Sequence, residues 1–133
     1  MRYQYHDGGR SDAGIKGRGG DCGIRAVAIA LDVPYLQAKR RMNDCIALMT
    51  GGMITSVASG VNPCVMHQVL SAAGWTASKS SGYLSDIPIK GRWVAYISGH
   101  YIAIIDGVAL DTWNSTVSKR TRCGSPKLKG YWS

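Results

Sequence analysis

The chain has 133 residues and a formal net charge of +8, and all eight of its acidic residues are aspartates. This length fits one globular domain that spans residues 1–133 and is large enough to bury its own core. No apolar run approaches the roughly 20 residues that cross a bilayer, and the polar start MRYQYHDGGR excludes a secretory signal, so we expect a soluble protein of the cytoplasm.

Glycine dominates the first part of the chain. Six glycines stand among polar residues in the segment DGGRSDAGIKGRGG, which predicts a glycine-rich N-terminal loop over residues 1–20. From Cys22 the pattern changes to CGIRAVAIALD, which is apolar on nearly all sides and typical of a buried central helix. Asp32 ends this helix, and Pro34 suits the first turn of a second helix over residues 34–48.

The second half predicts one more helix and then strands. Asn62, followed by a proline, is a typical N-cap, and Gly74 is a fitting C-cap, so we expect a third helix over residues 63–73. Four apolar, β-branched or aromatic segments then predict strands, at residues 75–78, 93–97, 101–105 and 108–112. Helices first and an antiparallel sheet second indicate an α+β domain.

The positive charge is concentrated at the end of the chain. Residues 119–133 hold five Lys and Arg and no acidic residue. We interpret this segment as a basic, solvated C-terminal tail. Such a tail can also bind nucleic acid or an acidic protein, but no nucleic-acid recognition motif accompanies it.

The four cysteines do not form a metal motif. Their spacing is wide and irregular, no CxxC pair exists, and the three histidines are far apart in the sequence, so we expect no metal site. Because we expect no export signal, we expect no disulfides either. We expect most of the cysteines to be small buried hydrophobes.

Cys22 differs from the others because it follows a glycine-rich loop and opens an apolar helix. The first N–H groups of a helix have no internal partner and carry partial positive charge, which favours a thiolate. The same kind of N–H group can stabilise an oxyanion, and the amides of Gly20, Asp21 and Cys22 are our candidates. Gly23 is expected to leave room for substrate beside the sulfur. The alternative is that Cys22 is an ordinary buried helix residue.

His100 and Asp111 flank a predicted hairpin. The Asp-Gly pair at 106–107 is a strong two-residue turn signal, so Ile105 should face Val108. This register places His100 and Asp111 on the same face of the sheet as diagonal neighbours. A carboxylate there can accept a hydrogen bond from the imidazole and stabilise its protonated form. The alternatives are that His100 is a residue at the rim of a strand and that Asp111 merely ends one.

A helix-opening cysteine, a strand-opening histidine and a carboxylate on the same face match the nucleophile, base and orienting residue of a thiol hydrolase. The segments GDCGIRAVAIALDVPY and GHYIAIIDGVALDTWNS resemble the two signature regions of papain-like cysteine peptidases. In that superfamily the nucleophile lies on a central helix, and the histidine and an Asp or Asn lie on adjacent strands. Cys22, His100 and Asp111 keep the same chain order.

The resemblance implies a papain-like domain. The compact size and the DCGIRA stretch look most like small members encoded by bacteriophages, and NlpC-type cell-wall peptidases and OTU deubiquitinases are more distantly similar. A viral origin would imply the host cytoplasm as the compartment.

One position departs from the pattern of this superfamily. Many members carry a glutamine upstream of the cysteine as an oxyanion donor, and the corresponding residue here is Lys16. Backbone amides are then the expected donors. Asn114 is a second candidate for orienting the histidine, but the hairpin register points it to the opposite face from His100.

Trp93 and Trp113 are candidates to wall a substrate groove, together with Gly23 and Gly99, since tryptophan offers a large rigid contact area. The alternative is that both tryptophans belong to the core. The sequence predicts a cysteine hydrolase without a cofactor that cleaves a peptide, isopeptide or related amide bond of a protein or peptide substrate. The second hypothesis is a catalytically weak or inactive papain-like scaffold that binds nucleic acid or an acidic protein through its basic tail.

Overall fold

The computed structural model describes residues 1–16, 20–57 and 60–133. The elements in chain order are β1 (Arg2–Tyr5), α1 (Cys22–Leu31), α2 (Tyr35–Met49), α3 (Pro63–Ala72), β2 (Ala77–Lys79), the 3-10 helix η1 (Leu84–Asp86), β3 (Arg92–Ile97), β4 (His100–Ile105), β5 (Val108–Asp111) and β6 (Gly130–Trp132). The three predicted helices and three of the predicted strands are present, the strand predicted at 75–78 is shifted to Ala77–Lys79, and β1 and β6 are additional. The part of the predicted glycine-rich loop at 17–19 lies outside the described residues.

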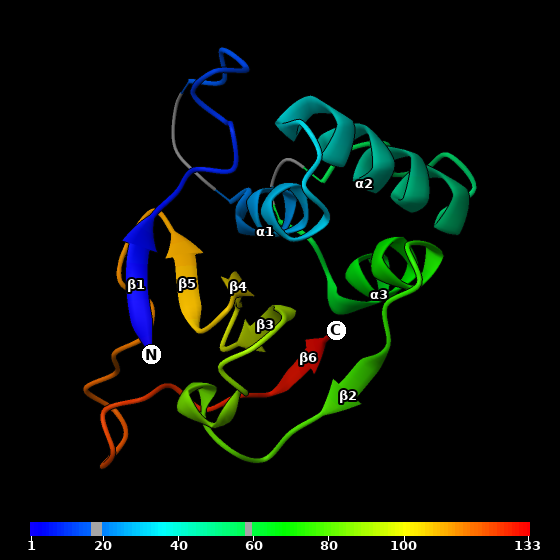
Figure 1. The fold of residues 1–133 in the computed structure, drawn as a ribbon. Helices are drawn as coiled ribbons and strands as arrows, with labels where there is room; N and C mark the ends of the chain where they lie inside the picture. Colours follow the sequence, from blue (N-terminus) through cyan, green and yellow to red (C-terminus); the bar gives the residue numbers. More distant parts are fainter. Residues whose placement is uncertain (17–19, 58–59) are drawn as a thin grey trace.

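The strands form one mixed sheet in the order β1-β5-β4-β3-β6-β2. β1 runs parallel to β5, and the other neighbouring pairs are antiparallel. The architecture agrees with the α+β prediction. The sequence predicts an antiparallel sheet, but the pairing of β1 with β5 makes it mixed. The three helices lie together on one side of the sheet (Figure 1), with α1 against β4 and α2 against both α1 and α3. Within the described residues, none of the helices combines the length and the apolar character needed to cross a membrane.

Residues 1–20 are not a continuous loop, because Arg2–Tyr5 form the edge strand β1. Tyr5 pairs with Asp111, and the His6 N–H donates a hydrogen bond to the Asp111 carbonyl at 2.9 Å. The segment RYQY is polar and largely exposed, so it lacks the apolar alternation that identifies a strand. It becomes a strand by pairing with a partner at the other end of the chain.

The predicted basic tail is partly built into the sheet. Gly130–Trp132 form β6 between β3 and β2, and the Trp132 side chain is buried. The Trp132 indole N–H donates to His67 Nδ1 on α3 at 3.4 Å. Leu128, just before this strand, has a lysine on each side. The sequence pattern there is therefore basic, and it does not indicate a strand. Residues 119–129, called the basic loop below, precede the strand.

The core has two parts, one on each face of the sheet. The larger part joins the helices to the sheet and includes Ile24, Val27, Met42, Val65, Leu70, Val94 and Ala103. The smaller part covers the opposite face and includes Leu84, Ile87, Ile102, Ile104 and Leu128. Every residue of α1 from Gly23 to Ala30 is buried, so α1 is the central helix that the sequence predicts. Its burial fixes the position of Cys22 at the start of the helix.

Candidate active site

Cys22 is the first residue of α1, directly after the N-cap residue Asp21. The Cys22 side chain is half-buried. The N–H groups of this first turn have no acceptor within the helix, and their partial positive charge favours an anionic sulfur. Because α1 packs against β4, Cys22 lies where a side chain from the start of β4 can meet it.

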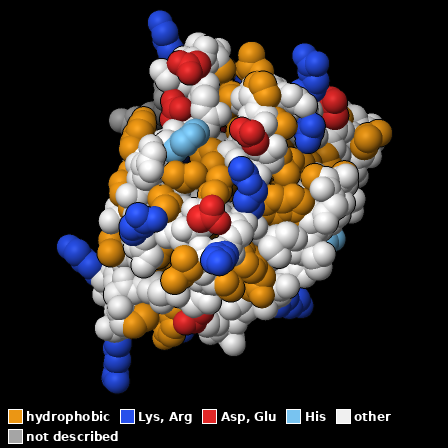
Figure 2. All heavy atoms as spheres, in the orientation of Figure 1, with side chains coloured by type: hydrophobic (Ala, Val, Ile, Leu, Met, Phe, Trp, Pro, Cys, Tyr) orange, Lys and Arg blue, Asp and Glu red, His pale blue; other side chains and the backbone are white. Residues whose placement is uncertain are grey.

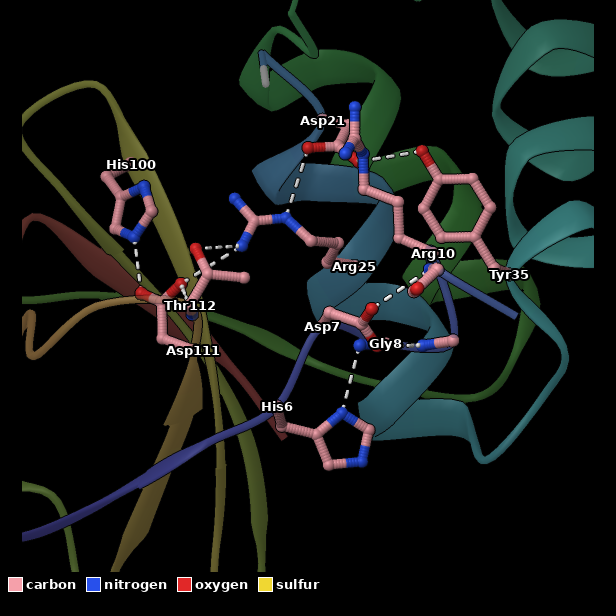
Figure 3. Close-up of polar contacts among 12 residues, drawn as sticks. His6, Asp7, Gly8, Arg10, Asp21, Arg25, Tyr35, His100, Asp111 and Thr112 are labelled. Atoms are coloured by element: carbon pink, nitrogen blue, oxygen red, sulfur yellow. Dashed lines mark hydrogen bonds and ion pairs between the residues drawn. The ribbon is translucent and has the colours of Figure 1, made fainter. Parts of the chain in front are cut away.

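The β4–β5 hairpin forms in the predicted register. Asp106 and Gly107 have φ values of 49° and 78°, the left-handed pair that suits a two-residue hairpin turn. Ile105 pairs with Val108 as expected. At the other end of the hairpin, the His100 and Asp111 side chains meet, with 2.6 Å between His100 Nε2 and Asp111 Oδ2 (Figure 3).

The Cys22 thiol contacts both His100 and the backbone of Tyr101. Burial alone raises the pKa of Cys22, but hydrogen bonds from the His100 side chain and the Tyr101 backbone, with the positive charges of His100 and Arg25, lower it. The net result is a Cys22 pKa below the ordinary value for a thiol. The Tyr101 backbone can donate only through its N–H, so the sulfur has a fixed donor beside the imidazole.

The other two groups shift in the matching directions. Burial acts to lower the pKa of His100, but hydrogen bonds with Asp111 and Cys22 and their charges raise it to about 9. Burial acts to raise the pKa of Asp111, but hydrogen bonds from His100 and Ser115 outweigh it and leave this pKa below the ordinary value. All three shifts favour a thiolate, an imidazolium and a carboxylate in series.

Asp111 is held by more donors than the sequence predicts. Its Oδ2 also accepts a hydrogen bond from Ser115 Oγ at 2.7 Å. Its Oδ1 accepts from the Thr112 N–H at 2.7 Å and from Arg25 Nη1 at 3.3 Å. The carboxylate is 3% exposed, so these contacts fix its orientation. An arginine inside an apolar helix was an available signal for Arg25, whereas nothing in the sequence marks Ser115.

The Asp21 side chain fixes the N-terminus of α1. Asp21 Oδ1 accepts a hydrogen bond from Arg25 Nε at 3.1 Å. Asp21 Oδ2 accepts one from the Tyr35 hydroxyl at 2.7 Å and lies 2.8 Å from Arg10 Nε (Figure 3). Burial and the hydrogen bond to Asp21 raise the pKa of Tyr35 to about 12, so Tyr35 stays a donor. The sequence placed Asp21 in the site only through its amide, and this carboxylate role was missed.

The predicted oxyanion donors lie at the start of α1. The Cys22 amide belongs to the first turn of the helix, and the Asp21 amide precedes it. Gly20 is exposed and has a φ of 98°, a conformation that glycine adopts readily. Lys16, which stands where the papain-like pattern has glutamine, is exposed. The geometry therefore offers backbone N–H groups for this role.

No known protein family, curated protein or solved structure matches this chain. The chemistry of the site therefore rests on its own geometry. The site combines a thiol with a lowered pKa, an imidazole with a raised pKa and a buried carboxylate that accepts several hydrogen bonds.

The two tryptophans lie in different places. The Trp113 ring centroid is 5.1 Å from that of His100, and Trp113 is 51% exposed, as expected for a residue that borders the site. Trp93 does not line the site. It packs edge-on against Tyr131, with centroids 5.2 Å apart, in the core part on the opposite sheet face. The neighbouring Val94 packs toward the helices, and strand alternation directs Trp93 away from them.

The two glycines expected to border a groove also differ. A Cβ on Gly23 would lie 2.8 Å from Val61 Cγ2, so this glycine permits close packing of α1 and does not make room for substrate. Gly99 has a φ of 67°, and a Cβ there would meet no heavy atom within 4 Å. Open space therefore lies beside the turn that leads into His100.

Asn114 does not orient the histidine. Its Oδ1 accepts hydrogen bonds from the Thr116 N–H at 3.2 Å and the Thr116 hydroxyl at 2.6 Å. It stabilises the turn after β5, which leaves Asp111 as the carboxylate that contacts His100.

The cysteines are free thiols, but the prediction that most of them are buried is wrong, because Cys22 and Cys45 are half-buried and Cys64 and Cys123 are exposed. Across residues 1–16, 20–57 and 60–133, no group of three or more His, Cys, Asp or Glu side chains is arranged to hold a metal ion. Cys45 provides a contrast with Cys22, because burial raises its pKa.

Proposed function

We propose that this protein is a cysteine hydrolase that cleaves a peptide, isopeptide or related amide bond through a thioester acyl-enzyme. The observation that carries this proposal is the connected series of Cys22, His100 and Asp111. The His100 imidazole bonds the Asp111 carboxylate at 2.6 Å and also contacts the Cys22 thiol, whose pKa is lowered. A thiolate is the nucleophilic form of cysteine, and a neighbouring imidazole activates it.

The acylation half-reaction uses the ion pair directly. The Cys22 thiolate attacks the substrate carbonyl carbon, a C–S bond forms, and the oxyanion accepts hydrogen bonds from N–H groups at the start of α1. The C–N bond then breaks as the imidazolium of His100 gives a proton to the leaving amine. Because Nε2 is bonded to Asp111, Nδ1 carries the transferred proton. The products are a thioester on Cys22, a free amine and a neutral imidazole.

Deacylation restores the starting state. His100 Nδ1 removes a proton from water as the water oxygen attacks the thioester carbonyl. The C–S bond breaks, the acid product leaves, and the thiolate and imidazolium form again. Asp111 remains ionised and stabilises the imidazolium in both half-reactions.

The arrangement supports a papain-like assignment of this single domain. The nucleophile begins a buried helix, and the base and the orienting residue lie on the adjacent strands β4 and β5, in the chain order of that superfamily. The free thiols suit a reducing compartment such as the cytoplasm. The proposed substrate is a protein or peptide.

A panel of electrophilic probes tests the proposal, with peptide and ubiquitin-like recognition elements and mass spectrometry to locate the adduct. We expect selective modification of Cys22, lost in His100→Ala and retained in Cys45→Ala, because Cys45 lies outside the site. Equal labelling of the four cysteines, or labelling of Cys22 that persists unchanged in His100→Ala, would contradict the proposal.

A second candidate function rests on the basic loop. Lys119, Arg120, Arg122, Lys127 and Lys129 are exposed, and none of them belongs to a salt bridge among the described residues. On the face seen in Figure 2, Lys and Arg side chains project around the outline of the molecule. This charge favours binding to nucleic acid or an acidic protein. Retention on DNA that falls steeply with salt, and is lost when the five residues become glutamine, would support this function.

A further inference from the structure

Charged side chains of alternating sign connect the N-terminal loop to His100. Arg10 lies 2.8 Å from Asp21, Asp21 lies 3.1 Å from Arg25, Arg25 lies 3.3 Å from Asp111, and Asp111 lies 2.6 Å from His100. Figure 3 shows the same series from the start of α1 to β4. Arg25 is the member that joins the helix to the sheet.

Arg25 contacts both sides through different nitrogens. Its Nε donates to Asp21 Oδ1, while its Nη1 donates to Asp111 Oδ1 and, at 2.7 Å, to Thr112 Oγ1. Arg25 is 8% exposed, so solvent screens these contacts little. Because the guanidinium is planar and rigid, its two ends fix Asp21 and Asp111 relative to each other. Asp21 adjoins the nucleophile, and Asp111 contacts the base.

We propose that Arg25 is a positioning residue for the reaction at Cys22: it holds the Asp111 carboxylate toward His100 and fixes that carboxylate relative to the helix that carries the thiol. This inference rests on the proposed function. It follows from the division of the Asp111 acceptors. Oδ2 serves His100 and Ser115, and Oδ1 serves Arg25 and Thr112. Loss of the Arg25 contact releases one side of this carboxylate.

A purely structural role for Arg25 makes a different prediction. A buried ion pair is weak support for stability, since desolvation of the two charges opposes their attraction. If Arg25 only stabilised the fold, its replacement would lower the melting temperature and leave the reactivity of the folded protein unchanged. If Arg25 positions Asp111, the pH profile of Cys22 reactivity changes, because that profile reports the state of His100 and the thiol.

The experiment compares Arg25→Lys with the wild type. Lysine keeps the charge but has a single ammonium group, which cannot donate to Asp21 and Asp111 through separate nitrogens. The measured quantity is the rate of Cys22 alkylation by iodoacetamide against pH, located by mass spectrometry. Among the described residues, the charged or titratable groups near the thiol are His100, Arg25 and Tyr101. We expect the rate at mildly acidic pH to fall by about 10- to 100-fold, the scale of a misplaced catalytic group, and the profile to move to higher pH.

Arg92→Lys is the matched control. Arg92 Nη1 also bonds to α1, but at its C-terminal end, through the carbonyls of Ile29 and Ala30 at 3.4 and 3.2 Å. We expect its alkylation profile to superimpose on that of the wild type. If Arg25→Lys does not fold, Thr112→Val decides, because it removes only the Nη1–Thr112 bond and should shift the profile in the same direction by less.

The outcomes separate this inference from the proposed function. The role of Arg25 is overturned if folded Arg25→Lys, or Thr112→Val in its place, has the wild-type pH profile. In that case the hydrolase proposal still stands, provided that Cys22 of the wild type reacts selectively. Wild-type Cys22 that reacts no faster than Cys45 overturns both. A shifted profile in Arg25→Lys with an unshifted one in Arg92→Lys supports the positioning role.

Discussion

Ser115 and His100 bond to the same oxygen, Asp111 Oδ2, at 2.7 and 2.6 Å. Ser115 is fully buried, so its hydroxyl serves the carboxylate without competition from water. Two donors on one oxygen keep the carboxylate ionised and aligned with the imidazole. Ser115 is therefore part of the support for the candidate site, although it does not contact the thiol.

We expect Ser115→Ala to lower the free energy of unfolding by about 1–3 kcal/mol, because a buried acceptor loses a donor. Cys22 alkylation should also slow at mildly acidic pH. Urea unfolding and iodoacetamide kinetics measure the two effects.

Ser125→Ala is the matched control. Ser125 lies in the basic loop, is also buried, and accepts a hydrogen bond from the Ser85 N–H at 3.0 Å. Ser125→Ala should lose stability and keep its reactivity. Equal reactivity in both variants would show that Ser115 does not act on the site.

Local signals in the sequence were sufficient for the hairpin and for the helix starts. The Asp-Gly turn fixed the register of β4 and β5 and thereby the meeting of His100 with Asp111. Asn62 forms the predicted N-cap, and its side chain accepts from the Val65 N–H. These features depend on residues that are close together in the chain.

Features that depend on distant partners were not predictable. Strand β1 exists because it pairs with β5 at the other end of the chain. The contact of Arg25 with Asp111 joins residues 86 apart in sequence. Trp93 was misplaced because it lies at the opposite end of β3 from Ile97, the residue that pairs with His100, and the sequence pattern alone does not give this distance along the strand. Gly23 was misread because its close neighbour, Val61, lies before another helix.

The two tryptophans offer a paired test. Trp113 is exposed and its ring lies tilted beside that of His100, whereas Trp93 packs in the smaller core part. We expect Trp113→Ala to change stability by less than about 1 kcal/mol and to alter the pH profile of Cys22 alkylation, because the His100 ring loses its neighbour. Trp93→Ala should cost about 2 kcal/mol, since a partly buried indole leaves a gap, and should keep the profile. The reverse assignment of effects would contradict these placements.

Gly23→Ala tests the packing of α1. Alanine favours a helix by about 1 kcal/mol over glycine, but the added Cβ would lie 2.8 and 2.9 Å from two atoms of Val61. Overpacking of this kind costs about 1–3 kcal/mol, so we expect net destabilisation in thermal unfolding. When Val61 is already alanine, the Gly23→Ala substitution should cost less stability than it does in the wild type, because the clashing atoms are absent. Additive losses in the double variant would rule out the clash.

The dependence of stability on pH follows from the shifted groups. The pKa of folded His100, about 9, is above its ordinary value of 6.5. The protonated ring therefore contributes its full stabilisation below pH 6.5, and this is lost as the pH rises through about 9. The pKa of folded Asp111 is below 3.8, so its contribution is present above pH 3.8 and is lost as the pH falls through the lower folded value.

Urea unfolding of the wild type and His100→Gln across this range measures the effect. The difference in the free energy of unfolding between the two proteins should be largest between pH 3.8 and pH 6.5 and should shrink as the pH rises above this range. A difference that stays constant as the pH passes through about 9 would exclude an imidazolium in the folded protein.

The titration of the Cys22 thiolate by ultraviolet absorbance, as the difference between the wild type and Cys22→Ser, tests the central ion pair most directly. We predict thiolate absorbance at pH values below the roughly 8.5 at which an ordinary thiol titrates, and a return to ordinary titration in His100→Ala. Ordinary thiol titration in the wild type, unchanged by His100→Ala, would contradict the pairing of Cys22 with His100.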